Sequence, residues 1–347
     1  MKTKAAILVR HNEPLQIEDD IEIPILEHGQ VLVKIYYTGI CHSQLMEING
    51  QRGEDPWLPH MLGHEATAEV VNIGSGISTV EIGDKVILSW IKGSGLDAPG
   101  TQYTHGDRII NAGAVTTFSE YAIVSENRCT RMPPELPMDI ACLLGCAVMT
   151  GFGAVSNTLR PVPEENIAIF GLGGIGLSAL LAANYHKLNP IIAIDVNEEK
   201  LELAKSLGAT HTINSNKLDP ISTIKDISNG GVDYALDASG LVQVIEQAFE
   251  SVRRGTGFCL FASHPAYGKK IKLDPFELIC GKRIQGTWGG ECNPDHDIPH
   301  IAKLYQDGQI NLDCFISEYY SLDTINEAIF ALQDKKENRA IVKIYDK

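Results

Sequence analysis

Three glycines within the segment Gly-Leu-Gly-Gly-Ile-Gly at residues 171–176 restrict the fold of this chain more than any other feature. The segment follows an apolar run at 166–170 and opens an apolar-periodic stretch at 177–185. Gly171 permits a tight turn, Gly173 lets the main chain approach a pyrophosphate, and Gly176 allows a helix to pack closely on a strand. The amino end of such a helix attracts phosphates. The motif therefore predicts a strand, a turn and a helix that bind a dinucleotide, with Gly174 also in the binding turn.

A second apolar run, at 190–194, ends at Asp195, nineteen residues after Gly176. A carboxylate at this position would accept hydrogen bonds from ribose hydroxyls and would repel a 2′-phosphate. The sequence therefore predicts NAD rather than NADP. The alternative is that the glycines form the turn of an ordinary α/β unit.

The spacing of apolar runs predicts two domains, which the 347 residues can supply at roughly 150 residues each. Short strands broken by Gly and Pro predict a β-rich domain up to residue 149. From 150 to 287, strand-like and helix-like runs alternate, which predicts a doubly wound parallel sheet covered by helices. The apolar stretch at 140–155 is too short to cross a bilayer and predicts a buried helix.

Composition narrows the partners and the compartment. The formal net charge of −15 argues against nucleic acid or an anionic membrane as the main partner. The eight cysteines are scattered, and the apolar run at 5–9 is too short for the core of a secretory signal. We therefore expect a cytoplasmic protein with reduced cysteines.

A set of cysteine and histidine motifs suggests a metal. Cys-His-Ser at 41–43 and Gly-His-Glu at 63–65 are followed far downstream by Gly-Cys at 145–146. Two thiols and one imidazole can hold Zn²⁺ and leave its fourth position open, which is the ligand count of a catalytic site. Cys142 lies four residues before Cys146, so a helix would place both on one face, and Cys142 is interpreted as a small buried apolar residue.

With these motifs in the same order, the chain resembles the zinc-dependent medium-chain alcohol dehydrogenases nearly from end to end. Four further motifs carry the resemblance: Gly-Asp-Lys-Val at 83–86, Phe-Ser-Glu-Tyr at 118–121, Thr-Gly at 150–151 and Asn-Arg at 338–339. The resemblance implies a GroES-like catalytic domain at 1–149 and 288–347, and a Rossmann NAD-binding domain at 150–287. It also implies hydride transfer between NAD(H) and a primary or secondary alcohol or its carbonyl compound, in a homodimer or homotetramer.

The resemblance also assigns roles to individual residues. Cys41, His64 and Cys146 match the zinc ligands, and Glu65 matches a carboxylate close to the metal. Ser43 matches the hydroxyl that takes the proton of the alcohol, although it could also cap a helix at 44–48. The remaining matches contact the dinucleotide: His42 and Arg339 at the pyrophosphate, Thr150 and Ile175 at the nicotinamide, and Lys200 at the adenosine ribose. Lys200 could equally be a solvated charge on a helix.

Three tryptophans are candidates for the substrate pocket. Trp90 matches an aromatic position of the pocket, and Trp57 and Trp288 lie in segments that approach it by analogy. Three large rings would narrow the cavity and favour a small or flat substrate. The alternative is that one or two of them only pack a core.

The chain departs from the family pattern at three places. Many relatives hold a second, structural zinc with four cysteines, but residues 89–107 contain none, so one zinc per subunit is predicted. Met46 stands where relatives can carry the histidine that ends the proton relay, so the relay must end at a ribose hydroxyl and water, at another side chain such as Glu47, or at an acid–base group of the substrate. Gln44 stands where the family often has an aspartate behind the zinc-binding histidine, and its oxygen would accept the imidazole N–H with less charge.

Three other functions compete with this interpretation. A polyol or sugar dehydrogenase of the same superfamily fits the single zinc and the missing relay histidine. A dehydrogenase of glutathione adducts is a further alternative, although no anionic-substrate site is evident in the sequence. A non-catalytic dinucleotide-binding protein is disfavoured, because all three zinc ligands and Ser43 are present.

Overall fold

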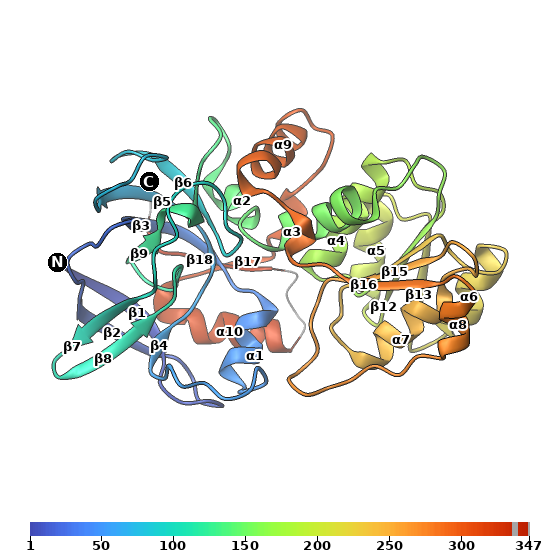
Figure 1. Ribbon diagram of the computed structural model, residues 1–347, viewed down its shortest axis with the longest axis horizontal. Coiled ribbons are helices and arrows are strands. Elements are labelled where there is room, and N and C mark those ends of the chain that lie inside the picture. Colours follow the sequence, from blue (N-terminus) through green and yellow to red (C-terminus); the bar gives the residue numbers. More distant parts are fainter. Residues whose placement is uncertain (335–338, 346–347) are drawn as a thin grey trace. The chain divides into compact units, whose positions relative to one another are not determined.

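The computed structural model describes residues 1–334 and 339–345, which form two compact units (Figure 1). Unit 1 contains Met1–Cys146, Asn293–Gly308 and the described residues from Leu312 onward. Unit 2 contains Ala147–Cys292 and the short segment Gln309–Asn311. No helix among the described residues is long and apolar enough to cross a membrane.

The unit bounds lie a few residues from the domain bounds expected at 149/150 and 287/288, and packing explains the difference. Residues 147–149 belong to the helix Ala147–Gly153 (α3), whose remainder lies in unit 2. Residues 288–292 include the 3₁₀ turn Gly289–Glu291, which packs against α3. The Cys292 thiol donates a hydrogen bond to the Met149 carbonyl over 3.1 Å.

Unit 2 is built on a six-stranded parallel sheet in the order β13-β12-β11-β14-β15-β16. The strands are β11 (Ile167–Phe170), β12 (Ile191–Asp195), β13 (His211–Asn214), β14 (Tyr234–Asp237), β15 (Phe258–Phe261) and β16 (Arg283–Gly286). The helices are α3 with the π-helix Ala154–Leu159, α4 (Gly174–Tyr185), α5 (Glu198–Ser206), α6 (Pro220–Ile227), α7 (Val242–Ser251) and α8 (Pro275–Ile279). Figure 1 shows α4 and α7 on opposite sides of the sheet. Two-sided coverage explains the uninterrupted apolar sequence of β11, which is buried on both faces.

Successive strands are added on one side of β11 up to β13, and then on its other side from β14 onward. This is the strand order of dinucleotide-binding sheets. Ligands of such sheets bind where the carboxyl ends of the strands meet this switch point. The glycine motif directly follows β11, so it lies at that point. The predicted fold class, a β-rich domain joined to a doubly wound parallel sheet, is confirmed.

Unit 1 is dominated by β-structure. A closed barrel contains β1 (Lys2–Leu8), β2 (Gln16–Glu22), β7 (Thr101–His105), β8 (Arg108–Ala112) and β4 (His60–Met61). A seven-stranded sheet contains β10 (Cys129–Arg131), β6 (Lys85–Ser89), β5 (Glu65–Ile73), β3 (Gln30–Gly39), β18 (Ala340–Lys343) and β17 (Glu318–Tyr320) in this order, with β9 (Tyr121–Ser125) paired to β3. Alternate residues of β3, namely Val31, Val33 and Ile35, point into one core, while Leu32 between them packs into another.

The helices of unit 1 are α1 (His42–Ile48), α2 (Met138–Leu143), α9 (Pro294–Gln306) and α10 (Ile325–Gln333). The prediction of one buried helix at 140–155 is wrong. The segment is buried, but α2 ends at Leu143 and α3 starts at Ala147. A Cβ at Gly145, in the break, would collide with the Leu88 carbonyl. Cys142 and Cys146 therefore do not share a helix face.

Candidate functional site

Cys41, His64 and Cys146 come together in unit 1. Their ligand atoms all lie within 4.8 Å of one another, and the described residues contain no other such cluster of three or more. Cys41 is the N-cap of α1, His64 lies just before β5, and Cys146 lies in the break between α2 and α3. His64 Nε2 is 3.2 Å from the Cys146 sulfur, and the two sulfurs are 3.9 Å apart.

The spacing and the charges of this cluster fit a zinc ion. Zn–S bonds of about 2.3 Å in a tetrahedron place two sulfurs roughly 3.8 Å apart. The pKa of Cys41 is lowered well below its usual value, because Cys146 donates a hydrogen bond to its sulfur and nearby His64 and Arg339 favour the thiolate. The pKa of Cys146 is raised, because its proton is held in the hydrogen bond to Cys41, and because burial and the negative charge of Cys41 oppose its ionisation. A divalent cation is what would let both thiols ionise together.

Gln44 contacts two members of the cluster. Its side-chain oxygen accepts the Cys41 main-chain N–H over 2.9 Å, and its nitrogen lies 2.5 Å from His64 Nδ1. In this arrangement the carboxamide nitrogen donates to Nδ1, whereas a His64 whose Nε2 bound a metal would carry its proton on Nδ1. The expectation that the oxygen of Gln44 accepts the imidazole N–H concerns that metal-bound state and stays a prediction; in this structure the oxygen accepts the Cys41 main-chain N–H.

Glu65 and Arg339 form a buried ion pair beside the cluster. Their relative exposures are 0% and 5%, and an Arg339 terminal nitrogen donates to Glu65 Oε1. Glu65 Oε2 and Arg339 Nε have no hydrogen-bond partner among the described residues. The predicted contact of Arg339 with a pyrophosphate stays a prediction, and its motif neighbour Asn338 lies outside the described residues.

Helix α1 carries the other predicted residues of this segment. The helix begins after Cys41, so the alternative role of Ser43 as the N-cap is wrong. The Ser43 hydroxyl is buried and has no hydrogen-bond partner among the described residues. His42 is exposed at the start of the helix, and Met46 is buried.

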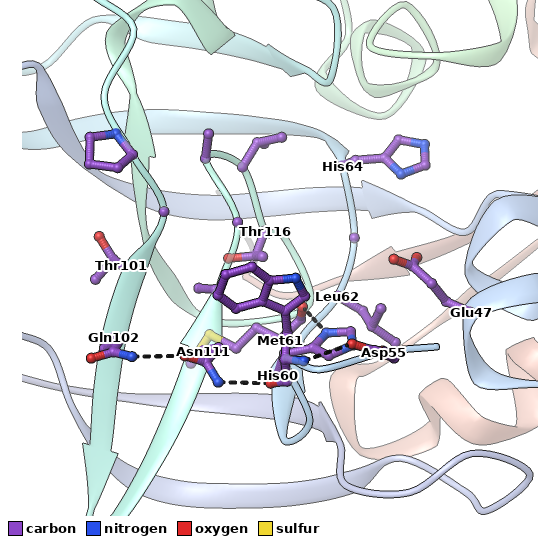
Figure 2. Close-up of a pocket in the computed structure, with 18 of the residues that line it drawn as sticks. Glu47, Asp55, His60, Met61, Leu62, His64, Thr101, Gln102, Asn111 and Thr116 are labelled. Atoms are coloured by element: carbon purple, nitrogen blue, oxygen red, sulfur yellow. Dashed lines mark hydrogen bonds and ion pairs between the residues drawn. The ribbon is translucent and has the colours of Figure 1, made fainter. Parts of the chain in front are cut away.

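A cavity of about 950 Å³ opens beside His64 in unit 1. Figure 2 shows His64 and Glu47 on one side of this cavity and Gln102 and Asn111 on the other. Trp57 and Trp90 both line it, whereas Trp288 lies in unit 2 and is 77% exposed, and the placing of all three in the substrate pocket stays a prediction. The cavity of unit 1 is therefore larger than the narrow one that three tryptophans suggested.

The cavity contains polar residues that no sequence motif indicated. His60 Nε2 is 2.8 Å from Asp55 Oδ2, and Asp55 also accepts the Trp57 main-chain N–H over 3.0 Å. Burial would raise the pKa of Asp55, but the hydrogen bonds with His60 and with the Trp57 N–H, together with the charges of His60 and His11, outweigh burial, and the pKa is lowered. Arg128 lines the same cavity. Isolated polar residues such as these form no motif in the sequence, so only the fold shows that they share this wall.

The glycine motif in unit 2 has the geometry that a dinucleotide requires. Gly171 has φ +87°, a left-handed conformation that suits glycine, and a Cβ at Gly176 would collide with the Gly171 carbonyl. Gly173 caps α4 at its amino end, and a Cβ there would meet nothing within 4 Å, so the space in front of it is open. Gly174 and Ile175 form the first turn of α4, with Ile175 partly exposed. The residues present fit a pyrophosphate at this helix end.

Asp195 ends β12 as predicted, but its carboxylate also organises the loop. One oxygen accepts the Leu172 N–H over 2.7 Å, and the other accepts the N–H groups of Val196 and Asn197 over 2.8 and 3.0 Å. Lys200 is partly exposed in the first turn of α5. Thr150 is 3% exposed and its hydroxyl has no hydrogen-bond partner among the described residues.

The cysteine-free segment at 89–107 is anchored by a carboxylate. Glu126 is fully buried and accepts the main-chain N–H groups of Ser78, Thr79 and Leu96 over 2.6, 2.8 and 2.7 Å. Burial would raise the pKa of Glu126, but these hydrogen bonds outweigh it and the pKa is lowered. Glu126 therefore ties together three chain segments in the region where many relatives use a metal.

Comparisons with known proteins agree with this geometry. Residues 27–134 match the model of the alcohol dehydrogenase GroES-like domain, and residues 174–307 match that of the zinc-binding dehydrogenases. The S-(hydroxymethyl)glutathione dehydrogenase of Synechocystis sp. is 34% identical over 369 residues, which cover 99% of this chain and 100% of that protein. The solved benzyl alcohol dehydrogenase of Acinetobacter calcoaceticus has a TM-score of 0.90 and 30% identity, covering 99% of this chain and 100% of that chain. An alcohol dehydrogenase zinc-binding domain protein from Burkholderia ambifaria has a TM-score of 0.91 and 30% identity, with 100% of both chains covered.

The two matching models identify unit 1 as GroES-like and unit 2 as the Rossmann-type dehydrogenase domain. The relatives are named as dehydrogenases of alcohols or of a hydroxymethyl adduct. This chain belongs to the zinc-dependent medium-chain alcohol dehydrogenase family, and it is an oxidoreductase of the alcohol dehydrogenase type.

Proposed function

We propose that this protein transfers a hydride between NAD(H) and a primary or secondary alcohol or its carbonyl compound, with one catalytic zinc per subunit. The observation that carries the proposal is the cluster of Cys41, His64 and Cys146, of which His64 lines a large cavity. A zinc ion there would supply a Lewis acid with an open position, and NAD would supply the hydride acceptor. We propose that Asp195 and the open face of Gly173 hold the dinucleotide and favour NAD over NADP.

Ser43 is the residue that we propose for proton transfer. Its hydroxyl is buried and has no hydrogen-bond partner in the described part of the chain, so it has both a donor and an acceptor site to offer. We propose that it accepts the proton of the substrate hydroxyl and passes it on. Glu47 lines the cavity and pairs with Arg52 over 3.4 Å, so it remains a candidate for the outer end of the relay, as does a ribose hydroxyl with water.

The experiment that tests the proposal is NAD⁺ reduction, followed by absorbance, with simple alcohols, benzyl alcohols, polyols, phosphorylated sugars and S-(hydroxymethyl)glutathione. Turnover of simple or benzylic alcohols that is lost in Cys41→Ala supports the proposal. Turnover only of polyols or sugar phosphates would move the protein to the sugar dehydrogenase branch. A protein that binds NAD but turns over nothing on the panel would support the non-catalytic alternative. Zinc analysis that gives two tightly bound ions per chain would contradict the proposed single zinc, and native mass measurement decides between dimer and tetramer.

A further inference from the structure

Arg128 places a cation in the wall of the cavity that contains His64. It lies in the 3₁₀ turn Glu126–Arg128, just before β10, and is partly buried. One terminal nitrogen of its guanidinium donates to the main-chain carbonyl of Trp90, a second residue of the cavity wall. The indole of Trp90 hydrogen-bonds to the sulfur of Cys146. Arg128 and the metal cluster are thus separated by the length of one tryptophan.

The charge of Arg128 is poorly compensated by the protein. No carboxylate of the described residues forms an ion pair with it, and its buried Nε has no hydrogen-bond partner there. Asp97 acts on it only through its charge, and the carboxylate of Asp97 is already occupied by Lys92 and Asn127 over 2.6 and 3.1 Å. Burial lowers the pKa of Arg128, which Asp97 only partly opposes. A partly buried guanidinium with unused N–H groups is poised for an anion.

The other arginine in this wall provides a contrast. Arg52 lines the same cavity, but it forms an ion pair with Glu47 over 3.4 Å, and its side chain is 44% exposed. Its charge is therefore balanced and screened by solvent. The chain as a whole carries a net charge of −15, which repels anions. An anionic substrate would need a local cation to bind, and Arg128 is the uncompensated one of the two.

We propose that Arg128 binds a carboxylate of the substrate, so that the preferred substrates are alcohols or aldehydes with a carboxylate at the end remote from the reacting carbon. This assignment rests on the proposed function. The substrate would extend along Trp90, with its hydroxyl at the metal cluster and its carboxylate at Arg128. A cavity of about 950 Å³ has room for such an elongated molecule, whereas a short alcohol would leave most of it to water.

The test compares two substrates that differ only in the carboxylate, 4-(hydroxymethyl)benzoate and benzyl alcohol, in the zinc-loaded enzyme. We expect the wild type to favour the carboxylate, and Arg128→Gln to lower kcat/KM for it by roughly 10- to 100-fold through KM, as expected for lost charge-assisted hydrogen bonds. The kcat/KM for benzyl alcohol should change little. Arg128→Lys, which keeps the charge but not the planar fork, should restore part of the loss. Arg52→Gln is the matched control and should leave the preference between the two substrates unchanged.

A second measurement does not depend on turnover. Calorimetry can use the unreactive pair 4-methylbenzoate and 4-methylbenzamide. Arg128→Gln should bind 4-methylbenzoate more weakly than the wild type does, and should bind 4-methylbenzamide with unchanged affinity. S-(hydroxymethyl)glutathione is a second substrate that carries carboxylates. The ratio of the wild-type kcat/KM values for 4-(hydroxymethyl)benzoate and S-(hydroxymethyl)glutathione shows whether the enzyme prefers an aromatic acid or a peptide-like adduct. A loss of kcat/KM in Arg128→Gln that is confined to substrates with a carboxylate, whether aromatic or peptide-like, supports the proposal.

Two results would overturn the assignment. An equal loss of kcat/KM for 4-(hydroxymethyl)benzoate and for benzyl alcohol in Arg128→Gln would mean that Arg128 only holds the main chain at Trp90. A wild type that prefers benzyl alcohol, with a ratio unchanged in the variant, would exclude a carboxylate site while leaving the proposed dehydrogenase function intact. Failure of the proposed function is distinct, because the wild type would then oxidise neither substrate.

Discussion

Replacing Glu126 with glutamine should destabilise unit 1 substantially. In the wild type, one carboxylate oxygen accepts N–H groups from Ser78 and Thr79, and the other accepts the Leu96 N–H. Glutamine keeps one oxygen, but its NH₂ group would face a second donor. One charge-assisted hydrogen bond is then lost and a buried N–H is left unpaired, which together cost about 2–4 kcal/mol. For a unit of this size, the midpoint of thermal unfolding should fall by roughly 5–15 °C.

Circular dichroism melts of Glu126→Gln and of Glu81→Gln test this magnitude. The Glu81 side chain is 83% exposed, so its neutralisation should change the midpoint very little. The pKa of Glu126 is lowered from its ordinary 4.5, so its carboxylate stabilises the fold above that pH, and the stabilisation is lost as pH falls through and below it. The difference between the unfolding midpoints of wild type and Glu126→Gln should therefore become smaller at acid pH. A variant that melts within about 1 °C of the wild type at neutral pH would refute the anchoring role.

Three further predictions concern the metal, the dinucleotide and the proton. Gln44→Asp should tighten zinc binding about tenfold in chelator competition, because a carboxylate can accept both the Cys41 N–H and an imidazole N–H; unchanged or weaker binding contradicts this. Gly176→Ala should weaken NAD binding more than tenfold by calorimetry, since its Cβ would collide with the Gly171 carbonyl and displace the loop; wild-type affinity would show that the loop tolerates it. Ser43→Ala should lower kcat about 100-fold while NAD affinity is retained, and Ser43→Thr should recover most of it; full activity in the alanine variant would remove Ser43 from the relay.

The sequence predicted the cofactor-domain fold well because its signals are local. The glycine motif and the strand that ends at Asp195 obey rules of close packing over a few residues, and the structure has β11, α4 and β12 where those rules require them. The apolar alternation of the sheet likewise depends only on which residues each strand buries. The prediction of a single helix at 140–155 failed because apolar composition is likewise only a local signal. The composition of this stretch reports burial, but the structure breaks the segment near Gly145, where a side chain would collide with the Leu88 carbonyl, a group distant in sequence.

The candidate site was predictable only as far as residue types define chemistry. Two thiols and an imidazole specify a metal cluster wherever the fold brings them, and the structure does bring them together. Hydrogen-bond roles follow instead from what neighbouring groups leave unsatisfied. The orientation of Gln44 is determined by the Cys41 N–H, which its oxygen accepts. The charge of Arg128 lacks an ion-pair partner among the described residues because the carboxylate of Asp97 already pairs with Lys92 and Asn127. Neither condition is visible in a one-dimensional pattern.

The metal cluster and the ion pair beside it are best understood as one electrostatic unit. A Cβ at Gly39 would collide with the Glu65 carboxylate, and one at Gly145 would press on Glu65 Cβ at 2.9 Å, so both glycines make room for this buried acid. With both thiols ionised, Cys41, Cys146 and Glu65 would carry three negative charges, of which Arg339 balances one. A divalent cation balances the other two. Without it, neutrality requires protons, which explains why the pKa of Cys146 is raised while that of Cys41 is lowered.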